Sequence, residues 1–236
     1  MHGLILAGGE GARLVTDGVR CPKPMVEIAG KPQILRLVET FEALGCATIT
    51  CMVRDGFPAM FELLRQAPAS RPVNVVACHT PSSLHTLVKG FHATPAGDVF
   101  CSVVDSVMRE RDWRRVYRGA VRHLAARADA VLAVTPYVDD ESPLWVERGD
   151  DGFVRRLDSQ PMSPPRVTGG VYAFSPRARD EGIAAERDGL QRMRAFLARL
   201  VERGVRVGAV EVPRIIDVDR ERDLEAANAW LRSTGE

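Results

Sequence analysis

The sequence lacks a strong charge bias and any hydrophobic run long enough to cross a membrane. Its formal net charge is +1, from 32 basic and 31 acidic side chains among 236 residues. Such a balance does not favour electrostatic binding to nucleic acid or to an anionic membrane surface. The longest apolar runs have the length of a β-strand, and the chain enters one almost at once, unlike a signal peptide. We therefore predict a cytoplasmic protein with no nucleic-acid or membrane partner.

Two common nucleotide-binding fingerprints are also missing. A dinucleotide-binding loop needs G-x-G-x-x-G, but Leu14 stands where the third glycine belongs. The P-loop string G-x-x-x-x-G-K-[ST] does not occur.

The five cysteines are odd in number and have no C-x-x-C spacing. We expect them to be free, mostly buried thiols in a reducing compartment.

The strongest pattern that is present lies in the first thirty residues. An apolar strand at 4–7 runs into a loop with three glycines within four positions: Gly8, Gly9 and Gly11. Glycines let backbone N–H groups turn towards an anion without a Cβ in the way. Arg13 follows the loop, and Lys23 lies between two prolines, which give a second cation a rigid mount. Together these groups predict a receptor for a triphosphate.

Residues 4–32 resemble the signature of the nucleotidyltransferases that activate sugar 1-phosphates, L-A-G-G-x-G-x-R-L followed by P-K-P-[LM]-[VL]-x-[IV]-x-G-[KR]-P. The resemblance implies a glycosyltransferase-A-like α/β fold. It also implies a Mg²⁺-assisted reaction in which an NTP and a phosphorylated acceptor give an NDP-linked product and pyrophosphate. Arg13 and Lys23 would be the catalytic cations. The nucleotide-binding residues implied or predicted are Leu6, Ala7, Gly8, Gly9, Gly11, Arg13, Lys23, Ser82 and Ser83.

Apolar segments alternate with helical patterns up to residue 135. Strands are predicted at 47–53, 73–77, 98–104 and 130–134, and helices at 32–44, 58–66, 82–92 and 112–126. This alternation favours a mostly parallel sheet. With the resemblance, it predicts a three-layer α/β sandwich that forms a single domain over residues 1–236.

The alternation of predicted strands and helices ends after Pro136. A hairpin with a polar turn is predicted over 144–157, followed by a strand at 166–174. We interpret 136–176 as an antiparallel, acceptor-side insertion packed beside the parallel sheet. A helix at 190–203, a strand at 205–212 and a helix at 220–231 complete the pattern.

Asp105 comes directly after the apolar strand at 99–104. Ligands of open α/β sheets lie beyond the carboxyl ends of the strands, and Mg²⁺ prefers carboxylate and phosphate oxygens. The resemblance also implies a metal-binding aspartate here, although the family more usually has Gly-Asp where this chain has Val104-Asp105. The structural alternative is a loop-capping aspartate.

The second metal ligand is expected late in the chain. Residues 217–227 resemble the closing motif D-[IV]-x-T-P-x-D-L-x-x-A, which implies Asp217 as that ligand. Asp219 is an alternative, because it would lie on the same face of an extended segment. Arg220-Glu221 stand where the motif has Thr-Pro, and Asp223 suits the first turn of a helix.

Two further pairs of residues are candidates for substrate contacts. Ser82 and Ser83 open a predicted helix where the resemblance implies base and ribose contacts, although either could simply cap the helix. Gly169 and Gly170 lie in a strand that resembles the acceptor-facing strand of the family, and glycine in a strand marks a close approach to the backbone. Residues 155–166 contain no lysine, so the partner of the acceptor phosphate stays unassigned.

The sequence therefore predicts a Mg²⁺-dependent nucleotidyltransferase acting on an NTP and a phosphorylated small molecule, preferably a sugar 1-phosphate. Three alternatives stay open: a cytidylyltransferase for a polyol, choline or phosphonate acceptor, a molybdopterin-type nucleotidyltransferase, and a non-catalytic nucleotide-binding regulatory protein. The intact set of Arg13, Lys23, Asp105 and Asp217 speaks against the last. The base, the acceptor and a homo-oligomeric state also stay open.

Overall fold

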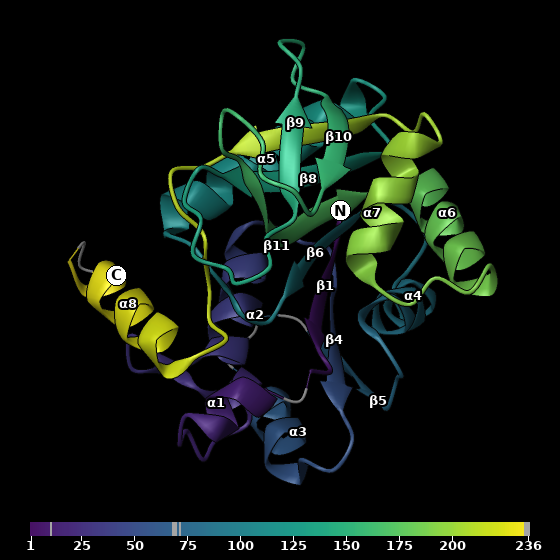
Figure 1. The fold of residues 1–236 in the computed structure, drawn as a ribbon. Coiled ribbons are helices and arrows are strands. Elements are labelled where there is room, and N and C mark those ends of the chain that lie inside the picture. The colour runs from purple at the N-terminus through teal and green to yellow at the C-terminus, as the bar shows by residue number, and fades with distance from the viewer. Residues whose placement is uncertain (10, 68–69, 71, 234–236) are drawn as a thin grey trace.

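The computed structural model describes residues 1–9, 11–67, 70 and 72–233. At the centre of this part of the chain is a nine-stranded sheet with the order β10-β9-β11-β6-β1-β4-β5, to which β8 and β12 are joined through β11 (Figure 1). The strands are β1 (His2–Ala7), β4 (Ile49–Arg54), β5 (Val73–Cys78), β6 (Val99–Val103), β8 (Ala130–Thr135), β9 (Trp145–Arg148), β10 (Val154–Asp158), β11 (Val167–Phe174) and β12 (Val207–Glu211). Two short pairs stand apart, β2 (Glu27–Ile28) with β3 (Lys31–Pro32) and β7 (Ser106–Val107) with β13 (Ile216–Asp217).

The sheet confirms the predicted mixture of parallel and antiparallel pairing. β1 pairs parallel with both β4 and β6, and β4 with β5. β9 and β10 form the predicted antiparallel hairpin. The segment 136–176 does not simply pack beside the sheet, however, because β11 lies inside it, antiparallel to both β6 and β8. The reason is its apolar second half: residues 171–174 are all buried, which suits a central strand better than an edge.

Helices cover both faces of the sheet, as a three-layer sandwich requires (Figure 1). Buried side chains of α2 (Gln33–Ala43), α3 (Pro58–Arg65) and α5 (Glu110–Ala125) pack on one face. Those of α4 (Ser83–Ala93), α6 (Pro176–Arg187) and α7 (Met193–Glu202) pack on the other. Two helices lie near the strand ends, α1 (Ala12–Thr16) and α8 (Glu221–Arg232), with a one-turn 3₁₀ helix, η1 (Lys23–Met25). No helix in the described residues is long and apolar enough to span a bilayer.

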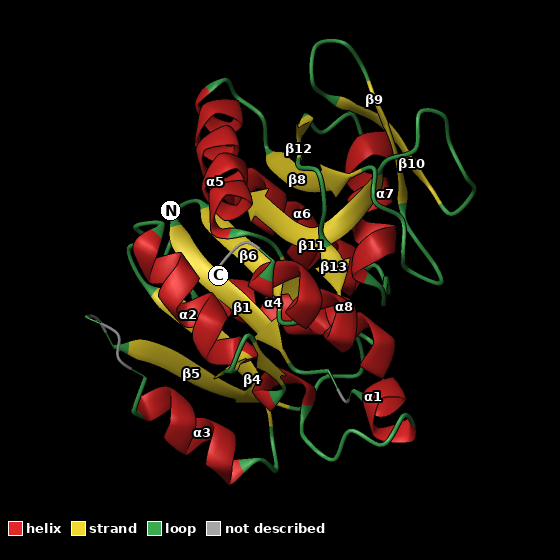
Figure 2. Cartoon of the chain, turned by 90° about the vertical axis from the view of Figure 1, so that its left-hand side faces the viewer, coloured by secondary structure: helices red, strands yellow, loops and turns green. Residues whose placement is uncertain are grey.

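The strand order places a ligand-binding edge between β1 and β6. The chain runs from β1 outwards to β4 and β5 and then returns to β6 on the other side of β1 (Figure 2). α2 and α4, the connections made before and after this reversal, lie on opposite faces of the sheet. Because β1 and β6 are adjacent parallel strands, the glycine loop after β1 lies next to the residues after β6, and ligands of open α/β sheets bind in the crevice beyond such carboxyl ends.

Candidate active site

A cavity of about 830 Å³ occupies this crevice. Its lining includes most of the predicted nucleotide-binding residues together with the first predicted metal ligand: Leu6, Gly8, Gly9, Gly11, Arg13, Lys23, Ser82, Ser83 and Asp105. Ala7 is fully buried and does not line the cavity. The structure thus brings together residues that the sequence separates by up to a hundred positions.

The glycine loop lies directly against the Pro-Lys-Pro segment. Gly11 has a left-handed φ of 66°, and a Cβ built on it would lie 2.9 Å from the Cβ of Lys23. A side chain at Gly11 would therefore be strained and would push Lys23 away. A Cβ on Gly9, in contrast, would meet no atom of the described, non-adjacent residues within 4 Å, so the loop backbone is open towards the cavity there.

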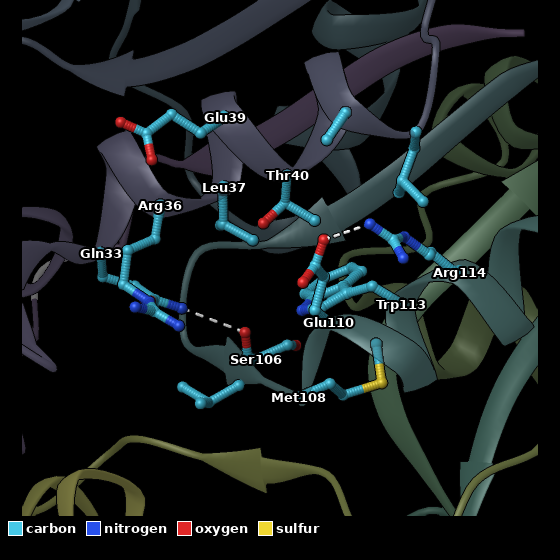
Figure 3. Close-up of a pocket in the computed structure, with 13 residues that line it drawn as sticks. Gln33, Arg36, Leu37, Glu39, Thr40, Ser106, Met108, Glu110, Trp113 and Arg114 are labelled. Carbon is cyan, nitrogen blue, oxygen red and sulfur yellow. Dashed lines mark hydrogen bonds and ion pairs between the residues drawn. The ribbon is translucent and has the colours of Figure 1, made fainter. Parts of the chain in front are cut away.

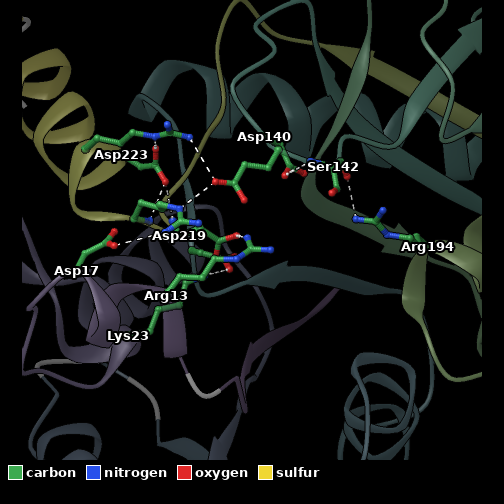
Figure 4. Close-up of polar contacts among 12 residues, drawn as sticks. Arg13, Asp17, Lys23, Asp140, Ser142, Arg194, Asp219 and Asp223 are labelled. Carbon is green, nitrogen blue, oxygen red and sulfur yellow. Dashed lines mark hydrogen bonds and ion pairs between the residues drawn. The ribbon is translucent and has the colours of Figure 1, made fainter.

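Lys23 connects the glycine loop to two of the aspartates. Its Nζ forms ion pairs with Oδ2 of Asp105 and Oδ1 of Asp219, and its side chain is only 9% exposed (Figure 4). Burial alone would lower the pKa of Lys23, but the carboxylates of Asp105, Asp217 and Asp219 outweigh it and raise that pKa above its usual value. Arg13 adds a more exposed contact, 2.8 Å from its Nη1 to Oδ2 of Asp219.

The pairing of two short strands brings Asp105 and Asp217 together. β7 directly follows Asp105, and its partner β13 contains Asp217. β7 and β13 are antiparallel with Ser106 opposite Asp217, and the N–H of Val218 donates to the carbonyl of Asp105 at 3.1 Å. One carboxylate oxygen each of Asp105, Asp217 and Asp219 lies within 4.8 Å of the other two. The predicted ligand Asp217 and its alternative Asp219 therefore both reach the same cluster.

The cluster carries more negative charge than the described side chains neutralise. Burial first, and then the neighbouring carboxylate of Asp105, raise the pKa of Asp217 well above its usual value. Oδ1 of Asp105 and Oδ1 of Asp217 are both buried and have no hydrogen-bond partner within the described part of the chain. Buried carboxylate oxygens that lack a partner are suited to hold a cation.

Two residues support the turn between Asp105 and β7. Ser106 donates from Oγ to the carbonyl of Gly169 at 2.8 Å, and Nε2 of Gln33 donates to the carbonyl of Ser106 at 3.0 Å. Gln33 lies at the start of α2, in a second cavity of about 370 Å³ between α2 and the segment 106–114 (Figure 3). Sequence reasoning missed Gln33, although a glutamine next to the apolar residues of a predicted helix was a signal.

Gly169 and Gly170 lie behind this turn rather than on the cavity wall. They occupy a register shift between β11 and β8, and Gly170 has a φ of 73°. A Cβ on Gly170 would lie 2.3 Å from Oγ of Ser106, and one on Gly169 would lie 2.3 Å from Cδ1 of Ile215. The structure thus gives both glycines a packing role, and their contact with the acceptor stays a prediction.

Ser82 and Ser83 line the cavity, but neither hydroxyl caps α4. Oγ of Ser82 donates to the carbonyl of Gln191 and lies 2.7 Å from Nδ1 of His85. Oγ of Ser83 accepts from the N–H of Met193 at 3.0 Å. Ser82 therefore attaches α4 to the segment before α7 and Ser83 attaches it to the first residue of α7, and their contact with the base stays a prediction.

An ion-pair network that sequence reasoning missed surrounds the closing segment. Nε of Arg220 donates to Glu141 at 2.9 Å, and its Nη1 lies 3.4 Å from Oδ1 of Asp17. Asp223, expected in the first turn of a helix, accepts from the backbone N–H of Asp219 and of Arg220 at 3.1 and 2.8 Å. The turn that carries Asp219 is thereby fixed to α8, to the end of α1 and to the loop at 141.

Comparison with known proteins identifies the family. A model of the MobA-like NTP transferase domain matches residues 3–203. The chain belongs to this family. Among curated relatives, it is 39% identical over 197 residues to a mannose-1-phosphate guanyltransferase of Pichia angusta, covering 76% of this chain and 51% of that protein. It is 29% identical over 197 residues to a glucose-1-phosphate thymidylyltransferase of Streptomyces griseus, covering 78% and 52%. The chain spans about half the length of the curated relatives it matches.

Solved structures confirm the predicted fold of this NTP transferase domain. A putative glucose-1-phosphate thymidylyltransferase from Bacillus anthracis superposes with a TM-score of 0.80 at 16% identity, covering 98% of this chain and 95% of that one. The inositol-1-phosphate CTP transferase from T. maritima superposes with a TM-score of 0.79 at 14% identity, covering 98% and 94%. The resemblance to sugar-1-phosphate nucleotidyltransferases, first carried by residues 4–32, is confirmed by the family match and the curated relatives.

Proposed function

We propose that this protein joins the nucleoside monophosphate part of an NTP to a sugar 1-phosphate and releases pyrophosphate. The curated relatives named for mannose 1-phosphate and glucose 1-phosphate support a sugar phosphate as the acceptor. One observation carries the proposal for this chain: Lys23, Asp105 and Asp219 line the cavity at the glycine loop, and Asp217 lies within reach of the two aspartates.

The proposed reaction is a single displacement at phosphorus. An oxygen of the acceptor phosphate attacks the α-phosphorus of the NTP, the bond from that phosphorus to the bridging oxygen breaks, and pyrophosphate leaves with the bond electrons. Arg13 and Lys23 would hold the triphosphate and neutralise charge that moves onto the leaving group. The open loop backbone around Gly9 would supply N–H donors to the phosphates.

The aspartate cluster fits Mg²⁺. Three carboxylates supply the hard oxygen ligands that this ion prefers, and two of their buried oxygens lack a partner among the described residues. Asp105 and Asp217 would hold the ion, with Asp219 as the third carboxylate in reach. When bound, the ion would stabilise negative charge on the reacting phosphates.

Lys23 would have two roles in this scheme. In the substrate-free protein its ammonium neutralises Asp105 and Asp219. Once a cation and a triphosphate occupy the cavity, the same ammonium can turn to the phosphate oxygens, because it sits on a flexible four-carbon chain. The flanking prolines and the contact with Gly11 keep the base of that chain fixed.

The test is pyrophosphate release with each common NTP against a panel of sugar 1-phosphates, with Mg²⁺ present. Asp105→Asn, which keeps the shape and removes one charge, gives the background rate. We expect one base and one acceptor class to stand well above it. If no NTP and acceptor pair exceeds that background, the protein binds nucleotides without catalysis and the proposal is wrong. A preference for CTP with polyol or choline phosphate would replace the sugar acceptor.

A further inference from the structure

A third cavity, of about 420 Å³, lies far from the glycine loop between α5, β12 and the turn that precedes β10. It shares no lining residue with the candidate active site. Four arginines from separate parts of the chain line it: Arg115 and Arg122 of α5, Arg148 at the end of β9, and Arg206 just before β12. Tertiary folding, not a run of basic sequence, brings these guanidinium groups to one place.

The positive charge in this cavity is not balanced locally. Its two acidic lining residues are already paired, Asp151 with Arg155 at 2.6 Å and Glu211 with Arg166. Within the described residues, the side chains of Arg115, Arg122 and Arg148 form no hydrogen bond or ion pair. The whole protein has a net charge of only +1, so this cavity is a strong local departure from a neutral surface.

The cavity has a packed floor and one pre-oriented guanidinium. The ring of His123 packs so closely on β12 that a Cβ on Gly208 would lie 2.6 Å from Nδ1. Arg206 stacks on Phe153, with 4.5 Å from its Cζ to the ring centroid, and the rings of His123 and Phe153 are nearly perpendicular, with 5.6 Å between their centroids. Stacking holds the planar guanidinium in one orientation while its N–H donors stay available.

The pKa of His123, which lines this cavity, is affected by the same positive charges. Burial first, and then the positive charges of Arg122 and Arg148, lower the pKa of His123. The acidic lining groups, Asp151 and Glu211, are not among the causes of this shift.

We infer that this cavity is a second binding site, for a small anion that carries a polyphosphate group. Several guanidinium groups that line one cavity can form bidentate hydrogen bonds to more than one phosphate group. A ligand with a single carboxylate would leave most of these N–H donors without an acceptor. The volume lies within the range of small-molecule pockets. Free polyphosphate and the phosphate chain of a nucleotide share this chemistry. The inference does not depend on the proposed catalytic function.

The test is calorimetric titration with inorganic tripolyphosphate in the absence of divalent cations. All proteins carry Lys23→Gln, which weakens phosphate binding at the candidate active site. The cavity variant adds Arg122→Gln and Arg148→Gln. The matched control adds Arg187→Gln and Arg232→Gln, which remove the same charge from two exposed arginines of α6 and α8 that do not line the cavity. Melting curves show that each variant is folded.

We expect the cavity variant to bind tripolyphosphate at least about tenfold more weakly, because two guanidinium groups that would form charge-assisted hydrogen bonds with the phosphates are lost, whereas the control should change little. Equal weakening in both variants would mean that only the overall charge matters and would overturn the inference. No binding to the Lys23→Gln protein would also overturn it. Parallel titrations with ATP distinguish a nucleotide from free polyphosphate, and tighter binding of a short single-stranded RNA would replace the small anion by a nucleic acid.

Discussion

Replacing Lys23 by Met should make the nucleotide-free protein bind a divalent cation more tightly while it loses activity. Lys23 places its ammonium between Asp105 and Asp219, two of the three carboxylates that would hold the ion. A cation that enters the wild-type cluster must therefore displace the ammonium. Methionine has a similar length and no charge, so it removes this competition and leaves the carboxylates in place.

The size of the effect follows from the contacts. Two opposite unit charges about 4 Å apart interact by about 4 kcal/mol at an effective dielectric constant near 20. Water screens part of this, because the side chains of Asp105 and Asp219 are 18% and 33% exposed. We therefore expect a gain of about 1–3 kcal/mol in cation binding, which corresponds to about 5- to 150-fold in affinity.

The assay is Mn²⁺ binding by electron paramagnetic resonance, with Mn²⁺ in place of Mg²⁺ and without nucleotide. Arg13→Met is the matched control, because it removes a charge paired with the same Asp219 from a side chain that is 48% exposed. Its effect should be clearly smaller. Activity of Lys23→Met should fall by about 100- to 1,000-fold, as for other lost transition-state contacts. Unchanged or weaker Mn²⁺ binding in folded Lys23→Met would refute the idea that Lys23 occupies the cation position.

Three further substitutions test the surroundings of the cluster. Asp217→Asn should lower Mg²⁺-dependent turnover by orders of magnitude without unfolding the protein, as checked by kinetics and melting; full activity would move the ligand role to Asp219. Gly170→Val should lower the melting temperature, because its side chain would collide with Ser106 and Val103 and the φ of 73° is strained for valine; equal weakening of NTP and acceptor in separate titrations of the folded variant would reject Gly170 as an acceptor contact. Asp223→Ala should cost about 1 kcal/mol in chemical denaturation through the lost helix cap and should weaken Mn²⁺ binding, because Asp219 loses its backbone anchor; Mn²⁺ binding equal to wild type would show that the cap does not position Asp219.

The elements that follow a local rule were predictable from the sequence. The glycine loop, the alternating strands and helices and the hairpin with its polar turn each depend on residues within about ten positions of one another. The predicted strand at 98–104 and helix at 32–44 correspond closely to β6 and α2. Asp105 could be placed at the crevice because the end of a parallel strand fixes where the next residue lies.

The parts of the fold and of the site that the sequence did not predict depend on contacts between segments far apart in the chain. α6 was not predicted, because residues 176–187 combine polar and small residues without a clear apolar repeat. The pairing of β7 with β13, two residues each, has no local signal, although it brings Ser106 opposite Asp217. The same limit explains why β11 was interpreted as part of an insertion beside the sheet, since its neighbours β6 and β8 come from elsewhere in the chain.

The departure from the family motif at Arg220-Glu221 has a structural explanation. Threonine before proline would cap and start a helix by itself. Here the carboxylate of Asp223, an aspartate that the motif also has, accepts from the N–H of Arg220 and caps α8 without them. The side chain of Arg220 is free to reach Glu141 and Asp17, which come from two separate earlier parts of the chain. Exposed ion pairs of this kind contribute little to stability, about 0–1 kcal/mol each, so their consequence is positional. They join the end of the glycine-loop helix, the loop at 141 and the turn that carries Asp219 into one connected unit around the aspartate cluster.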